Sequence, residues 1–521
     1  MKFIVYALGG AWLLSRAAFP AAADAETLAD AIAAAYRDNP TLQQQRALLR
    51  SSDENYVQAA AGLRPTVQTQ LYEQYNDSRL GKSTIAANSI YGSTSTRNES
   101  NAATGQVVVS FPVFTGGKVT AQIRQARAQI GSGREGLRAS EGDLLLNVIG
   151  SYVSVRRDQQ ILTVRATALQ QFVYQHDEAV ARRAAGDATL TDVAQADAQL
   201  QAERANYSDA QQQLQVDRAE YASLVGHDPG QLAAEPDLPN LPVDVDKAFD
   251  IAILNSPEVR AAVLSEEASR QGVAAARAQF NPTVALQGSY GYTGVGVPLN
   301  AVNLERDFTV QAVVTQPLFT GGLYGSELRR ALEQNNADRS AIEIARREVV
   351  QNVANGWNAI LTARNDVSTQ QHQVDAARLT LEGMQQEYRA GLRSTFEVLY
   401  AAQIYRDAQI SYLSARYNYY IGEATVLRYI GRLEAADLTS GTPLYNPVSH
   451  FNKVRDMGAT PLDSIGRLID SFAAPEVTQS ELRGPDRATA PTFASPASPV
   501  PTDALPATHL INVPLPGTAA P

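Results

Sequence analysis

The sequence predicts an α+β chain made of two copies of one unit, each combining a pair of β-strands with very long coiled-coil helices. Two observations lead to this prediction. The first is an internal repeat, in which residues 31–42 resemble 248–259 and residues 112–117 resemble 317–322. The second is a heptad pattern that continues through a helical stretch of roughly 68 residues, on the order of 100 Å of helix. A unit of roughly 200 residues is far longer than a solenoid repeat, so we interpret the chain as a duplicated architecture.

The composition excludes several classes of protein. The 521 residues contain no Cys, which excludes a disulfide scaffold, a thiolate metal site and a lipidated N-terminal Cys. A net charge of -10 argues against a nucleic-acid partner, because nucleic-acid binders neutralise phosphates with clustered Lys and Arg. The sequence contains no HExxH, P-loop or GxSxG motif, and its five His are scattered. We therefore expect no enzyme, no catalytic residue, no cofactor and no metal.

The N-terminus has the features of an export signal. Lys2 supplies the positive charge, residues 3–14 form an apolar stretch, and residues 21–25 are small residues suited to cleavage. The expected signal covers residues 1–23, with 25 as the alternative cleavage point. The apolar stretch is too short for a transmembrane helix, and no later run reaches the roughly 18 apolar residues that such a helix needs.

Four segments follow the signal. The first repeat takes residues 24–230 and the second takes 247–432, with a Pro-rich linker at 231–246 between them. Residues 433–521 contain many Pro, Ala, Ser and Thr. We expect this tail to be largely disordered, with some order near the body and disorder beyond about residue 475.

Each repeat begins with a helical stretch that ends at Pro65 or Pro282, because Pro lacks an amide donor. Period-two alternation of apolar residues then indicates a strand, and a polar, Gly-containing loop separates it from a second strand. The expected ranges are helical stretches at 27–62 and 247–279, first strands from 67 and 284, loops at 78–104 and 293–305, and second strands at 106–114 and 307–319.

A long helix follows each strand pair, at 118–185 and 323–390, and a Gly-containing turn leads to a shorter helix at 190–225 or 394–430. In the second repeat the heptad positions are Val353, Ile360, Val367, Val374, Leu381 and Tyr388. Heptads predict coiled-coil packing, and small residues on the adjacent seam predict close helix approach. The helices before the strands and after the turn together match the length of the long helix, so stacked end to end they can pair with it.

Four amphipathic strands pose a problem of closure. An open sheet in a bilayer leaves edge amides unsatisfied, and closed membrane barrels begin at about eight strands. Three chains would contribute twelve strands, so we expect a homotrimer whose barrel lies in a lipid bilayer and continues into a cylinder of the long helices. The aromatic residues on or near these strands suit an interfacial girdle: Tyr72, Tyr75, Phe111, Phe114, Tyr290, Tyr292, Phe308 and Phe319.

With these motifs in place, the chain resembles the TolC family of outer membrane efflux proteins over residues 26–432. The resemblance rests on the duplicated Phe-Thr-Gly-Gly strand-to-helix signature, the turn at 391–399 (GLRSTFEVL) and the segment 415–419 (ARYNY). Because no Cys follows the signal, the chain departs from the lipoprotein branch and is closer to the branch that also serves type I secretion.

The resemblance implies a channel-tunnel in the outer membrane of a Gram-negative cell, with its helical tunnel in the periplasm. Such a channel exports proteins, small toxic compounds or both. It docks with a periplasmic adaptor protein and an inner membrane transporter of the ABC or RND type. A secreted or periplasmic coiled-coil adhesin or scaffold without a pore is the alternative, but it does not explain two strand pairs at corresponding positions.

The resemblance also implies a periplasmic gate at the two helical turns. Matching the motifs places Thr191, Asp192, Tyr388 and Arg393 in this gate and Glu397 in an acidic ring at the entrance. The next position of that ring holds Tyr400 rather than a carboxylate, which leaves cation preference open. A simpler interpretation is that Asp192 and Glu397 are the last residues of two capping boxes, at 189–192 and 394–397.

Overall fold

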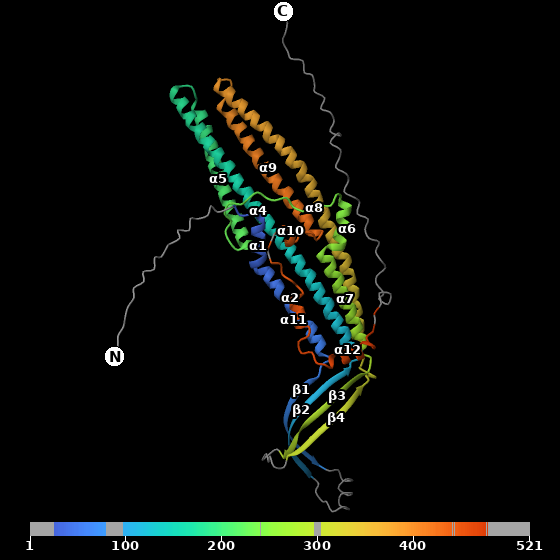
Figure 1. Cartoon of the computed structure of the whole chain (residues 1–521). Helices are drawn as coiled ribbons and strands as arrows, with labels where there is room; N and C mark the ends of the chain where they lie inside the picture. The colour runs from blue at the N-terminus through green and yellow to red at the C-terminus, as the bar shows by residue number, and fades with distance from the viewer. Residues whose placement is uncertain are drawn as a thin grey trace, which may run out of the picture.

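The computed structural model describes residues 25–79, 97–239, 241–295, 304–439, 441, 443–475 and 477. The chain is a long rod with a β-sheet at one end and two helical hairpins at the other (Figure 1). The expected signal segment, 1–23, lies outside the described residues. Within the described part, no helix combines the length and the apolar character needed to cross a membrane.

The two long helices are the axis of the rod. Helix α4 runs over Lys118–Ala185 and helix α8 over Leu323–Arg389, which confirms both helices within one residue of their predicted ranges. Each turns back into a shorter helix, α5 (Leu190–Val225) or α9 (Thr395–Tyr429). Close approach on the small-residue seam is also confirmed, because a Cβ on Gly356 would lie 2.9 Å from a methyl group of Val426.

The helical stretch before each strand pair is broken in two, a feature that the sequence prediction missed. The first repeat has α1 (Leu28–Asp38) and α2 (Pro40–Ala61), and the second has α6 (Val245–Asn255) and α7 (Pro257–Ala278). Each break falls before a Pro at the first helical position, where a missing amide donor costs nothing. Helices α2 and α7 pair with the sheet-proximal halves of α4 and α8, and α5 and α9 pair with the distal halves (Figure 1).

The four strands form one antiparallel sheet in the order β1-β2-β3-β4. They are β1 (Thr66–Arg79), β2 (Arg97–Phe114), β3 (Thr283–Val295) and β4 (Glu305–Thr315). Residues directly opposite one another in such a sheet point to the same face. The register thus gives one apolar face, with Val67, Leu71, Val107, Val109, Phe111, Val284, Leu286, Tyr290, Phe308, Val310 and Val314. The opposite face is mostly polar and includes Gln68, Gln70, Gln106, Ser110, Gln287, Ser289, Thr309 and Gln311.

The sheet corrects three details of the prediction. The strand pair β1 and β2 extends further than expected, since 97–104 belong to β2 and an Arg97–Asp77 ion pair of 2.9 Å joins the strands there. Strand β4 ends at Thr315 instead of 319, because Pro317 cannot donate to a ladder. Tyr72 pairs with Thr104 on the polar face, so it does not belong to an outward aromatic girdle.

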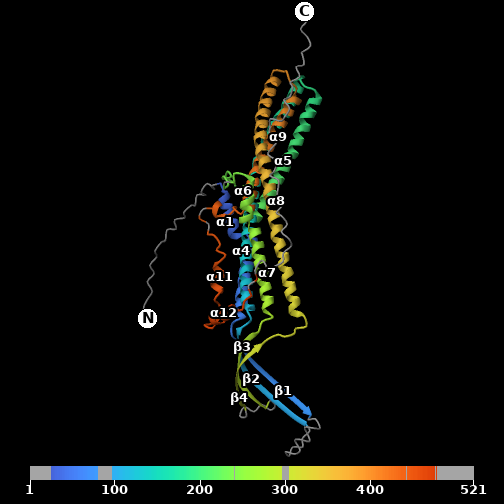
Figure 2. The same ribbon diagram turned by 90° about the vertical axis from the view of Figure 1, so that its right-hand side faces the viewer.

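The C-terminal segment returns along the rod toward the sheet and packs on its base. It contains three short helices, α10 (Ala435–Leu438), α11 (Ser449–Val454) and α12 (Asp463–Ser471). Figure 2 shows α11 and α12 beside the lower part of the helical body. The order expected near the body thus extends through residue 475, so the first half of the tail is not disordered. The disorder expected beyond it falls almost entirely outside the described residues.

Candidate functional site

The two hairpin turns lie together at the end of the rod that is farthest from the sheet (Figure 1). Each turn begins with a Gly in the left-handed region, Gly186 with φ 90° and Gly391 with φ 78°. Residues with a Cβ rarely adopt this conformation, so Gly permits both reversals. All five residues assigned to the gate and the acidic ring lie within seven residues of these turns.

Asp192 closes a capping box at the start of α5. Its carboxylate accepts hydrogen bonds from the Thr189 backbone N–H and hydroxyl, both at 2.8 Å, and Thr189 Oγ1 accepts from the Asp192 backbone N–H. The bond from the Thr189 N–H holds the pKa of Asp192 below its usual range. Thr191, at the second position of α5, is exposed. The structure thus confirms the capping interpretation of Asp192.

Glu397 closes the corresponding box at the start of α9 and also binds an arginine. Its carboxylate accepts from the Ser394 N–H at 2.9 Å and pairs with Arg393 at 2.7 Å. The hydrogen bond from the Ser394 N–H, followed by the one from Arg393, lowers the pKa of Glu397 to about 2. Arg393 pairs in addition with Glu387 at 2.7 Å, so one guanidinium links both sides of the turn.

Tyr388 connects the two hairpins. The guanidinium of Arg182, near the end of α4, lies 4.4 Å from the centre of the Tyr388 ring, within the range of a cation–π contact. The Tyr388 hydroxyl also accepts a hydrogen bond from Thr395, at 3.4 Å. Arg393 and Asp192 themselves are held by local partners in the single chain. Their role in a gate between chains stays a prediction.

A buried ion pair below the tip also links the hairpins, and the sequence prediction missed it. Glu203 of α5 pairs with Arg406 of α9 and, at 3.4 Å, with Arg165 of α4. The side chains of Glu203 and Arg406 are 1% and 8% exposed. The available signal was the position of Glu203 on the buried seam of α5, which is otherwise apolar at Ala196, Leu200, Leu214 and Tyr221.

Asp217 is a second acidic residue on the same seam. Its carboxylate accepts from Gln213 at 2.8 Å and lies 3.3 Å from Arg157, which also binds the neighbouring Asp158. Burial, followed by the hydrogen bond with Asp158, raises the pKa of Asp217 to about 6. Among the described residues, no group of three or more His, Asp or Glu could hold a metal ion.

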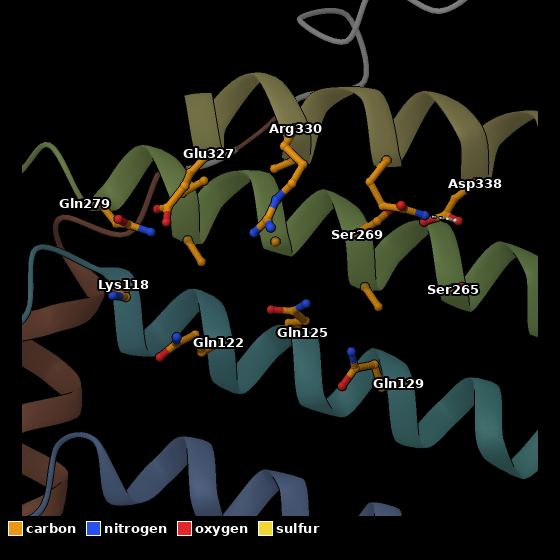
Figure 3. Close-up of a pocket in the computed structure, with 16 residues that line it drawn as sticks. Lys118, Gln122, Gln125, Gln129, Ser265, Ser269, Gln279, Glu327, Arg330 and Asp338 are labelled. Atoms are coloured by element: carbon orange, nitrogen blue, oxygen red, sulfur yellow. Dashed lines mark hydrogen bonds between the residues drawn. The ribbon is translucent and has the colours of Figure 1, made fainter. Parts of the chain in front are cut away.

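The helical wall above the sheet carries a polar concavity of 620 Å³ between α4, α7 and α8. Figure 3 shows Gln122, Gln125 and Gln129 along α4, with Glu327 and Arg330 on α8 facing them across α7. Amide, hydroxyl and charged side chains make up most of its lining, with small residues such as Ala268, Gly272 and Ala276 between them, and it holds none of the large apolar or aromatic side chains typical of a small-molecule site. Such a surface suits contact with water.

Near the tip the chain carries an apolar groove of 490 Å³ between α8 and α9. Met384, Phe396 and Tyr400 line it beside Glu397. Tyr400 is 57% exposed in the single chain and stacks on Phe396, with ring centres 6.3 Å apart. The position that could have extended the acidic ring is therefore part of an apolar surface.

Comparison with known proteins agrees with this architecture. A family model described as outer membrane efflux protein matches residues 31–227 and 248–432, one match in each repeat. The chain is 28% identical to the outer membrane efflux protein BepC of Brucella suis biovar 1 (strain 1330) over 437 residues, covering 84% of this chain and 92% of BepC. It is 25% identical to the outer membrane protein TolC of Escherichia coli (strain K12) over 491 residues, covering 90% and 96%.

Among solved structures, the outer membrane protein VceC of Vibrio cholerae is similar with a TM-score of 0.64 and 20% identity, covering 78% of this chain and 96% of VceC. The fold prediction is confirmed: this is the architecture of the trimeric TolC-like channels, with four strands per chain. Channels of this family act in the outer membrane as trimers, with adaptor and inner membrane transporter proteins, and their tunnel crosses the periplasm. The family model covers most of both repeats, and the chain belongs to the family of outer membrane efflux proteins.

Proposed function

We propose that the trimer exports proteins, small toxic compounds or both, in contact with a periplasmic adaptor and an ABC or RND transporter, and that it catalyses no reaction. The sheet carries this proposal, because one of its faces is apolar and the other is polar. Lipid requires the first face and a water-filled lumen requires the second. A scaffold without a pore would leave both faces and the free edges of β1 and β4 unexplained.

Channel formation can be tested with the purified protein. Detergent-solubilised trimer added to planar bilayers should give discrete conductance steps, since a twelve-stranded barrel is wide enough for ions and water. A stable monomer in detergent, or a membrane-bound trimer that gives no conductance under any voltage, would contradict the proposal.

We propose further that Thr191, Asp192, Tyr388 and Arg393 hold the tip closed. Two observations support this role: the residues lie at adjacent turns, and Tyr388 already contacts the other hairpin through Arg182. Each exposed link contributes only about 0 to 1 kcal/mol, so closure must add several links over three chains. The Arg393→Ser and Tyr388→Phe changes should therefore raise conductance modestly when made singly and strongly when combined.

The gate experiment needs a matched control. Arg378→Ser removes a more exposed arginine of α8, 59% against 40% for Arg393, whose pair with Glu382 is long at 3.8 Å. The control should conduct like the unchanged protein. If the double gate variant folds normally and also conducts like the unchanged protein, then these residues only shape the turns.

Glu397 is proposed as the acidic ring at the entrance. Because its pKa is about 2, its carboxylate stays charged at any pH that the cell or a bilayer experiment uses. Glu397→Ala should weaken block by multivalent cations without raising conductance. If multivalent cations block the Glu397→Ala channel as strongly as the unchanged protein, then the Glu397 charge is neutralised by Arg393 and does not face the ion pathway.

A further inference from the structure

Helix α12 has its polar and apolar sides reversed relative to a normal surface helix. The residues that face the protein are Asp463, Gly466 and Asp470, spaced by three and four, and all are buried. The large residues that face away, on the helix and at its two caps, are apolar and well exposed: Leu462 at 43%, Ile465 at 54%, Leu468 at 61% and Phe472 at 84%. The exposed Ser464 and Ser471 lie among them. A helix that packs on a soluble protein places its apolar side inward, so this helix is not held by apolar packing.

Hydrogen bonds hold α12 instead. The Asp470 carboxylate, fully buried, accepts from the N–H and hydroxyl of Thr115 at 2.7 and 2.8 Å and from the N–H and hydroxyl of Thr120 at 3.2 and 2.8 Å. It also accepts from the Gly117 N–H at 3.1 Å. A negative charge at the start of a 68-residue helix is favourable, because the free N–H groups and the helix dipole both attract it.

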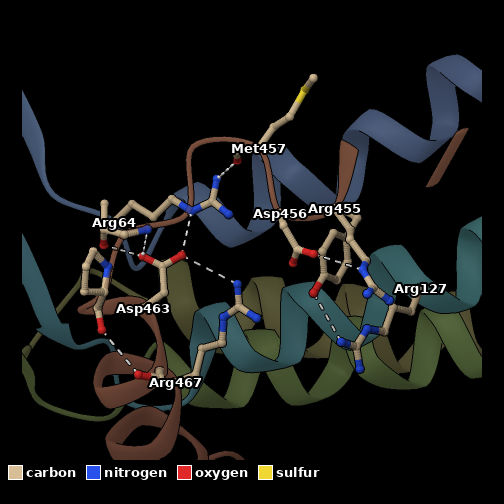
Figure 4. A network of polar contacts seen from close by, with 11 residues as sticks. Arg64, Arg127, Arg455, Asp456, Met457, Asp463 and Arg467 are labelled. Atoms are coloured by element: carbon tan, nitrogen blue, oxygen red, sulfur yellow. Dashed lines mark hydrogen bonds and ion pairs between the residues drawn. The ribbon is translucent and has the colours of Figure 1, made fainter. Parts of the chain in front are cut away.

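A buried ion pair fixes the other end of α12. Arg64, between α2 and β1, donates to Asp463 at 3.0 Å and to the Met457 carbonyl at 2.6 Å. Figure 4 shows this guanidinium between the Met457 loop and α12. The two anchored ends leave the apolar side of α12 facing outward, and no described residue covers it.

The contacts of α12 also show its height along the rod and the side of the helical wall (α4, α7 and α8) on which it lies. Thr115 directly follows the last residue of β2, so α12 lies at the rim of the sheet, where the barrel meets the tunnel. Around α4, Thr120 is two residues from Gln122, a rotation of about 200°. The polar concavity and α12 are therefore on opposite sides of the wall. The exposed apolar side of α12 does not suit a water-filled lumen, whereas the polar side of the wall does, so we assign α12 to the outside.

We propose that α12 is an interfacial anchor, whose apolar side inserts into the periplasmic leaflet of the outer membrane at the base of the barrel. The lipid-facing side of the sheet ends beside it at Phe114, so the apolar surface of α12 continues an established lipid interface. The basic residues on and before this helix suit phosphate headgroups: Lys453 and Arg455 are exposed, and Arg467, which pairs with Asp463 at 3.6 Å, is partly exposed. The chain has no Cys to carry a lipid, so this anchor is made of side chains alone.

The absence of native Cys allows a direct test with one introduced Cys per chain. Leu468→Cys is labelled with a polarity-sensitive fluorophore, and SDS-resistant trimers are reconstituted into phosphatidylethanolamine and phosphatidylglycerol vesicles. Some of the lipids carry a nitroxide quencher on the headgroup or at a shallow acyl carbon. Leu286→Cys, on the apolar face of the sheet, calibrates contact with lipid. Leu254→Cys, 73% exposed at the end of α6, calibrates exposure to water.

We expect lipid nitroxides to quench the Leu468 label at least half as strongly as the Leu286 label, most strongly from the shallow position. Iodide in the buffer should quench it far less than the Leu254 label. Quenching by iodide at the level of Leu254 would overturn the proposal, since α12 would then face water. Protection from both quenchers would also overturn it, because a neighbouring chain would then cover this side.

Discussion

Replacing the buried Glu203–Arg406 pair should change the stability of the trimer in a way that distinguishes it from the exposed links at the tip. Both side chains are less than a tenth exposed, and they join α5 to α9 across the two hairpins. Removing one partner of a buried pair typically costs about 3 to 5 kcal/mol, because the other charge stays buried without compensation.

The two single variants should differ. After Arg406→Met, Glu203 keeps Arg165 at 3.4 Å, so we expect the lower end of the range, about 3 kcal/mol per chain. After Glu203→Leu, Arg406 keeps only Asp407, whose side chain is half exposed, and the cost should be larger. The double variant replaces both charges with apolar groups of similar volume but leaves Arg165, 18% exposed, without Glu203, so its stability should recover much, but not all, of the loss.

Thermal and denaturant unfolding of the detergent-solubilised trimer, followed by circular dichroism, measures these differences as a double-mutant cycle. Arg393→Ser is the exposed control and should cost far less than either single variant of the buried pair, because exposed ion pairs add little stability. The reasoning is refuted if either single variant is as stable as the unchanged protein, or if the costs of the two single variants simply add in the double variant. If opening separates the hairpins, then the double variant, which is stable but lacks the link, should also conduct more than the unchanged protein.

Four further predictions concern the sheet, the junction, the tail and one carboxylate. Leu286→Asp, on the apolar face, should reduce the yield of SDS-resistant trimer, whereas Gln287→Asp on the opposite face should not; equal yields would contradict the assigned faces. Asp470→Ala should lower stability by about 2 to 4 kcal/mol per chain through loss of a charged helix cap, whereas the exposed Asp456→Ala should have little effect in the same unfolding experiment. Truncation after residue 480 should leave trimer formation and export intact, but removal from residue 462 onward should destabilise the trimer, because it also deletes Asp470 and the buried Val477. Asp217 has a pKa raised to about 6, so between about pH 4 and pH 6 the folded chain holds a proton that the unfolded chain has lost. Stability should therefore fall as pH rises through 6, and unfolding measured across this range should show a weaker dependence in Asp217→Asn.

Periodic and local signals were sufficient for most of the fold. Heptads predicted long coiled-coil helices, and the Phe-Thr-Gly-Gly signature and the Gly turns predicted the ends of α4 and α8 within one residue. The capping boxes at 189–192 and 394–397 could also be predicted from the sequence, because the residues that interact in each box are only three positions apart. The breaks before Pro40 and Pro257 were also visible in the sequence, because a Pro at an internal helical position ends or kinks a helix.

The features that the prediction missed depend on contacts between distant residues. Glu203 and Arg406 are 203 positions apart, and nothing near either residue indicates its partner. The short helix α12 stands in a Pro-rich region whose composition resembles disorder, although Leu462, Ile465, Leu468 and Phe472 have helical spacing. The apolar periodicity alone could not show that these residues face outward. That conclusion required the two buried Asp residues that hold the opposite side.

The distribution of polar contacts along the rod supports the proposed opening at the tip. At the tip, the Arg393 links join side chains that are 37% to 47% exposed, and each such link is worth about 0 to 1 kcal/mol. At the junction with the sheet, Arg64 and Asp463 are less than a tenth exposed, and Asp470 is fully buried with five hydrogen bonds. Breaking those contacts would expose buried charges and cost several times more. A partner that pulls on the hairpins will therefore separate the tip first, while the junction keeps the tunnel aligned with the barrel.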